Sequence, residues 1–130
     1  MRKFFLFVLF LSSFSTMNMI FAANDKIDIV VVGFTEHGPL QPTIKAIKDV
    51  VSKYGDKIKL TIISSSTDEG SKYMKKHKLD AHLNVVINGK YKYNVNGKKI
   101  VFQWFEGKQW TKKDLEDVIN NILNPDKEKK

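Results

Sequence analysis

The sequence contains no cysteine, and this absence excludes a wide range of chemistry. A chain without thiols forms no disulfide, offers no thiolate nucleophile and carries no CxxC redox pair. It also provides no cysteine ligands for zinc and no N-terminal cysteine for lipid attachment. Its length of 130 residues favours one domain over two.

The N-terminal residues have the features of an export signal. A basic start, Met1–Lys3, precedes the apolar run Phe4–Leu11, and the small residue Ala22 ends the segment. This pattern predicts a signal peptide over residues 1–22, with cleavage after Ala22 or, as second choice, after Ala23. A membrane anchor is the alternative, but the uninterrupted apolar run is shorter than the roughly 20 residues that span a bilayer. We therefore expect an exported protein, periplasmic or extracellular, without stable membrane insertion after cleavage.

Arginine is absent beyond this segment, which argues against a nucleic-acid partner. Loss of Arg2 and Lys3 with the signal lowers the formal net charge from +8 to +6. Arginine is the side chain best suited to bidentate contacts with phosphates and bases. The remaining lysines are scattered among acidic residues, apart from the C-terminal tail. This distribution predicts a solvated lysine surface and no nucleic-acid binding.

The apolar pattern of the following residues predicts the order βαβαββα. Strands are expected over 27–34, 57–63, 83–87 and 100–105, and helices over 43–54, 68–78 and from the cap at Thr111 to about 124. The first strand is almost continuously apolar, which is typical of a strand covered on both faces. The crossover rule makes the first two strands parallel.

Two Asn-Gly pairs, Asn88-Gly89 and Asn96-Gly97, are signals for tight hairpin turns. Either could close the hairpin between the last two strands. We favour Asn96-Gly97, with Lys90–Val95 prolonging the third strand as an extended ribbon. The tail, residues 125–130, is charged and expected to be disordered.

This element order and one loop resemble the thioredoxin-like superfamily over residues 25–124. Where that family carries Cys-Gly-Pro-Cys, this chain reads His37-Gly38-Pro39-Leu40. The resemblance implies an α/β, three-layer sandwich with a central mixed four-stranded sheet, as in exported bacterial members. The family often has a buried acid where this chain has Val31, and a cis-proline where it has Ala81 or His82. Without cysteine, thiol–disulfide exchange by this chain alone is excluded.

Three functions from different classes remain. The first is a redox-inactive module that binds a protein or peptide through the edge that the resemblance implies, namely Glu36, His37, Gly38, Pro39, Leu40, Ala81 and His82. The second is a metal-binding protein, because imidazoles of His37 and His82 with the Glu36 carboxylate are ligands that suit Zn²⁺ or Cu²⁺. The third is a non-thiol enzyme with His37 as general base. The competing interpretation is structural: His37 as an exposed loop residue and His82 as a turn residue.

Aromatic residues concentrate around the hairpin and before the last helix. Most are expected to pack in the core beneath that helix. The alternative is an exposed aromatic strip for a peptide or protein partner, in which Tyr91 and Tyr93 would be the exposed pair. The whole set is Tyr91, Tyr93, Phe102, Trp104, Phe105 and Trp110.

Overall fold

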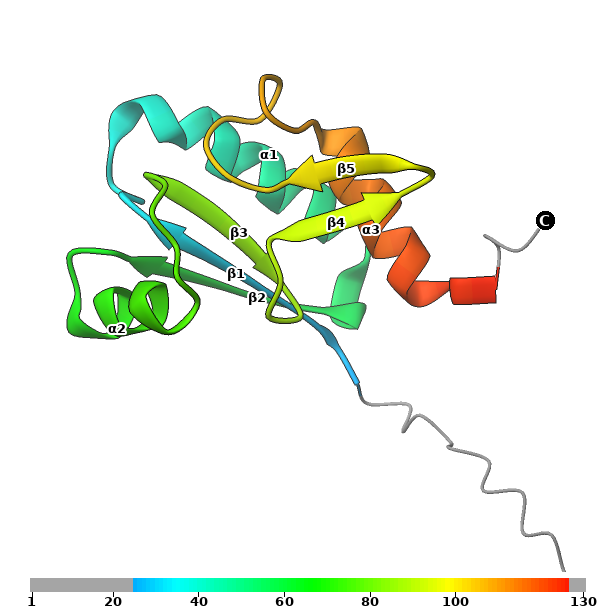
Figure 1. The fold of residues 1–130 in the computed structure, drawn as a ribbon, viewed down its shortest axis with the longest axis horizontal. Helices are drawn as coiled ribbons and strands as arrows, with labels where there is room; N and C mark the ends of the chain where they lie inside the picture. The colour runs from blue at the N-terminus through cyan, green and yellow to red at the C-terminus, as the bar shows by residue number, and fades with distance from the viewer. Residues whose placement is uncertain (1–24, 127–130) are drawn as a thin grey trace, which may run out of the picture.

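Residues 25–126 are described by a computed structural model and form a mixed α/β fold (Figure 1). The predicted signal peptide, residues 1–22, and residues 127–130 of the tail lie outside the described residues. No helix in the described part of the chain is long and apolar enough to cross a bilayer. The elements are β1 (Ile27–Gly33), η1 (Gly38–Leu40), α1 (Gln41–Ser52), η2 (Gly55–Lys57), β2 (Ile58–Ser64), α2 (Asp68–Lys76), β3 (Leu83–Ile87), β4 (Lys92–Val95), β5 (Lys98–Val101) and α3 (Lys112–Leu123).

Strand β1 is the centre of a three-stranded mixed sheet. It pairs in parallel with β2 on one side and antiparallel with β3 on the other. Ile29 and Val31 pack in the core beneath α1 and α3, whereas Val30 and Val32 pack in the cluster beneath α2. The prediction of a first strand buried on both faces and parallel to the second is confirmed.

Both Asn-Gly pairs form turns, so the predicted ribbon is wrong. Asn88 and Asn96 have φ values of 47° and 53°, and the glycines that follow also have positive φ. At the first turn Ile87 and Lys90 exchange two backbone hydrogen bonds, of 2.7 and 3.0 Å. The chain therefore reverses after β3 and does not prolong it. Each dipeptide accepts the left-handed backbone of a type I′ turn, so each turn forms.

The expected single four-stranded sheet is replaced by the three-stranded sheet and a separate β4–β5 hairpin. The predicted strand 100–105 divides between them. Its start pairs with β4, and Phe102–Trp104 then lies beside β3, joined by Val85 N–H to Phe102 O and Trp104 N–H to Leu83 O, both 2.9 Å. A left-handed φ of 68° at Trp104 ends this pairing, because it lies outside the extended region.

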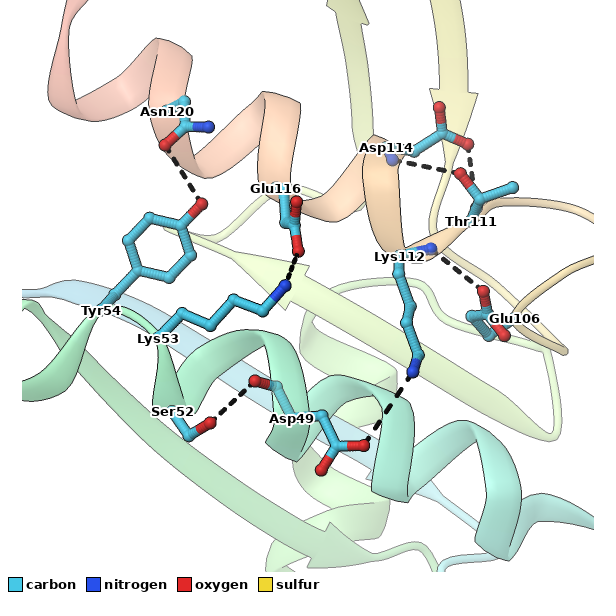
Figure 2. Close-up of polar contacts among 10 residues, drawn as sticks. All are labelled: Asp49, Ser52, Lys53, Tyr54, Glu106, Thr111, Lys112, Asp114, Glu116 and Asn120. Atoms are coloured by element: carbon cyan, nitrogen blue, oxygen red, sulfur yellow. Dashed lines mark hydrogen bonds and ion pairs between the residues drawn. The ribbon is translucent and has the colours of Figure 1, made fainter.

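Helices α1 and α3 lie together over one face of the sheet and are joined by polar contacts (Figure 2). Lys53, the C-cap of α1, contacts Glu116 of α3 at 2.5 Å, and Tyr54 donates a hydrogen bond to Asn120 at 3.1 Å. The predicted cap of α3 is confirmed as a capping box. Thr111 Oγ1 accepts the Asp114 N–H, and the Asp114 carboxylate accepts the Thr111 N–H.

The close approach of β1 to the residues before β3 requires glycine at position 33. A Cβ atom there would lie 2.0 Å from His82 O, so we expect Gly33→Ala to lower the free energy of unfolding by about 2–4 kcal/mol. Gly38→Ala is the control, because its Cβ would meet nothing within 4 Å. Urea denaturation measures both. A loss below about 1 kcal/mol for Gly33→Ala would contradict the close approach.

The buried Asp114 makes stability depend on pH. Burial alone would raise the pKa of Asp114, but hydrogen bonds from Lys98 and from Thr111 outweigh it and hold the pKa below its ordinary value. Since the folded pKa lies below the unfolded one, about 3.9, the stabilisation is present above the unfolded pKa and is lost as the pH falls through the folded pKa.

We therefore expect the free energy of unfolding to decrease on acidification below about pH 4, and Asp114→Asn to flatten that decrease. Denaturation curves across this range measure the slope. Asp56→Asn, the same substitution at an exposed position, is measured beside it for comparison. An equal slope in Asp114→Asn and the wild type would refute the assignment.

Candidate functional site

The loops after β1 and before β3 meet at one end of the sheet. Gly33 pairs with Leu83 across the two strands, and the Phe34 N–H donates to His82 O at 2.8 Å. The missing side chain at Gly33 allows this contact. Residues 34–40 and 80–82 therefore adjoin, and together they contain every edge residue predicted from the sequence.

The loop after β1 is held by its own neighbours. Leu40 is only 1% exposed and anchors the loop in the core, contrary to its predicted place on the binding edge. Gln41 Nε2 donates to Thr35 O at 2.7 Å and to His37 O at 3.3 Å. Glu36, His37, Gly38 and Pro39 remain exposed.

In the second loop the two predicted edge residues differ. Ala81 is 3% exposed, so it supports the edge from within, whereas the His82 side chain is exposed. The backbone of Ala81 is also held from within, since Ala81 O accepts a hydrogen bond from the buried Asn84 Nδ2 at 2.9 Å. The exposed part of the predicted edge thus consists of Glu36–Pro39 and His82.

Three aromatic rings form the most prominent feature of this end of the sheet. The His82 ring lies between Phe34, with centroids 5.0 Å apart and edge to face, and Trp104, with centroids 4.8 Å apart and tilted by 31°. Phe34 is 49% exposed and Trp104 is 37% exposed. We call Phe34, His82 and Trp104 the ring cluster. It extends through Trp104 to Phe105, at 6.5 Å.

Tyr91 and Tyr93, the pair named for the alternative of an exposed aromatic strip, are half-buried. The Tyr93 hydroxyl donates to Ile87 O, and burial raises the pKa of Tyr93 to about 12. Tyr91 packs against the apolar cluster beneath α2. The prediction that Phe102 and Trp110 lie in the core is confirmed, since both are almost fully buried. Phe34 and Trp104 take the exposed positions.

The residues proposed as metal ligands do not form a group in the structure. The Ser64 hydroxyl donates to the Glu36 carboxylate at 2.9 Å, which directs Glu36 toward the end of β2. Within residues 25–126 no three His, Asp or Glu side chains are grouped so that they could hold a metal ion. The metal-binding hypothesis stays a prediction that no contact favours. For the general-base hypothesis, the hydrogen bonds shown for His37 involve only its backbone.

Trp104 adopts a backbone conformation that bulky residues rarely take. Its φ is 68°, in the left-handed region, which costs a non-glycine residue about 1–2 kcal/mol. Strained residues of this kind concentrate at functional sites. Because the side chain is also exposed, core packing gives no reason for tryptophan here. Trp104 is therefore a candidate member of the functional site.

We expect Trp104→Asn to change the free energy of unfolding by less than about 1 kcal/mol. Asparagine tolerates the left-handed region, so the relief of backbone strain offsets the loss of the ring contacts. Thermal and urea denaturation measure the change. The matched control is the other tryptophan. Trp110→Ala, in the buried core, should cost about 3–5 kcal/mol. A loss above about 2 kcal/mol for Trp104→Asn would show that the Trp104 ring stabilises the fold, contrary to this prediction.

Comparison with known proteins assigns no family to the chain. No protein-family model, no curated protein and no solved structure matches it. The function is therefore inferred from the residues and contacts of this end of the sheet.

Proposed function

We propose that the protein is an exported, redox-inactive thioredoxin-like module that binds a protein or an extended peptide through the ring cluster and its adjoining loops. The single observation that carries the proposal is the exposure of the Phe34 and Trp104 rings around His82. Exposed aromatic side chains that lie together are typical of interaction sites, and tryptophan is prominent among residues that dominate binding energy.

The thioredoxin-like part of the proposal has support from topology. A βαβ unit with parallel β1 and β2 is followed by an antiparallel β3, and helices lie on both faces of the sheet. The short pairing of Phe102–Trp104 with β3 supports the proposal, because the resemblance implies a fourth strand beside the third. The His37-Gly38-Pro39-Leu40 loop precedes α1, as the redox loop of the family precedes its helix.

Backbone groups beside the ring cluster suit an extended peptide. In the loop before β3, Ala81 O accepts from Asn84 and His82 O accepts from Phe34. The N–H groups of the exposed residues Asp80 and His82 have no acceptor among residues 25–126. Main-chain hydrogen bonds supply affinity when an extended segment is bound, and neighbouring side chains supply selectivity. The rings of the cluster would contact apolar side chains of such a partner.

The proposal predicts measurable peptide binding by the exported chain. Arrays of overlapping ten-residue peptides provide the probe, and calorimetry with the best peptide provides Kd. Phe34→Ser and Trp104→Asn should each raise Kd about tenfold or more, because truncation of a central aromatic residue costs about 2 kcal/mol.

Ile62→Ser is the matched control, since Ile62 of β2 is as exposed as Trp104, at 37%, and lies outside the site. Its Kd should equal that of the wild type. An array without bound peptides, or an equal loss in Ile62→Ser, would refute the proposal. Insulin-reduction activity is expected to be absent, because the chain provides no thiol.

A further inference from the structure

A fully buried amide is hydrogen-bonded to the segments that carry the ring cluster. Asn84 of β3 has no exposed surface, and its neighbours along the strand are apolar. Its Nδ2 donates to Ala81 O at 2.9 Å and to Val32 O at 3.2 Å, and its Oδ1 accepts from Gln103 Nε2 at 2.9 Å. Burial of an amide costs free energy unless its hydrogen bonds are made, and here both donors and the acceptor are used.

Each partner of this amide is close in sequence to one ring of the cluster. Ala81 directly precedes His82, Gln103 directly precedes Trp104, and Val32 lies two residues before Phe34. Gln103 Nε2 also lies 3.4 Å from the Asp80 carboxylate, at the start of the same loop. One side chain therefore connects the three segments from which the rings project.

The Asn84 amide joins the loop before β3 to β1, where few backbone contacts do so. No peptide bond among residues 25–126 is cis. The loop before β3 therefore lacks the cis bond that the resemblance implies at this position. Within residues 25–126, the one backbone hydrogen bond shown between this loop and the residues that follow β1 is that from the Phe34 N–H to His82 O. A valine at position 84, as at the adjacent Val85 and Val86, would pack in the sheet but would leave Ala81 O and Val32 O without the amide.

We propose that Asn84 and Gln103 are positioning residues of the binding site, which fix the His82 and Trp104 rings relative to Phe34. Their effect on affinity depends on the proposed peptide-binding function. Their effect on the ring geometry does not, so the two parts are separable by experiment.

Gln103→Met is the main test, because it keeps the length of this half-buried side chain and removes its donor. Hydrogen exchange of the Phe34 amide, which is bonded to His82, and of the Trp104 amide, bonded to Leu83, should accelerate about tenfold. The Ile87 amide, at the far end of β3, should exchange at the wild-type rate. The His82 ring protons should lose the NMR shift that stacking on Trp104 produces, and peptide Kd should rise about fivefold to tenfold.

Two further variants separate positioning from general stability. Gln103→Lys keeps a donor beside Asn84 and Asp80, and should restore the amide protection and the His82 shift. Tyr54→Phe removes the bond between Tyr54, just after α1, and Asn120 of α3, away from the site, and should leave every readout of the cluster unchanged. Gln103→Ala repeats the test with a smaller side chain if Gln103→Met does not fold.

Wild-type exchange rates and His82 shifts in Gln103→Met would overturn the proposal, as would equal acceleration of the Ile87 amide. Lack of rescue by Gln103→Lys would count against it in the same way. If the wild-type chain binds no peptide but Gln103→Met still releases the rings, the proposed function fails and the positioning role stands.

Discussion

The contact between β1 and the loop before β3 is the constraint on which this end of the molecule depends. The Phe34 N–H reaches His82 O only because Gly33 leaves room for the carbonyl. This contact places the Phe34 and His82 rings next to each other. It also sets where β3 begins, and β3 in turn pairs with the segment that carries Trp104. The ring cluster is therefore a consequence of strand pairing, although its members are far apart in sequence.

The pattern of the sequence predicted the elements well where local signals and burial agree. The continuous apolar run of β1, the apolar face of α1 and the Thr111–Asp114 box each specify one structure. The hairpin region was harder, because two Asn-Gly pairs carry the same turn signal and nothing local chooses between them. The structure uses both, and the expected fourth strand is divided as a result.

The site was only partly predictable for a related reason. The edge residues follow from the order of the elements, but exposure within the edge depends on contacts between distant segments. Leu40 and Ala81 face inward, whereas Phe34 and Trp104 face outward. The positive φ of Trp104 carries no signature in the sequence, because tryptophan is not a residue that favours it. In the structure Trp104 is exposed, although Phe102, two residues before it, is fully buried.

Several features that lower the stability of the fold lie at this end of the sheet, and folding alone explains none of them well. An exposed tryptophan occupies a strained backbone position, a second large apolar ring faces solvent, and an amide is buried within an apolar strand. The buried amide has its hydrogen bonds satisfied, so its contribution is geometric: it holds loops together that apolar packing would leave less constrained. The exposed Phe34 and Trp104 rings have no comparable structural role within the chain. Stability given up at a rigidly supported surface is the pattern expected when that surface binds a partner.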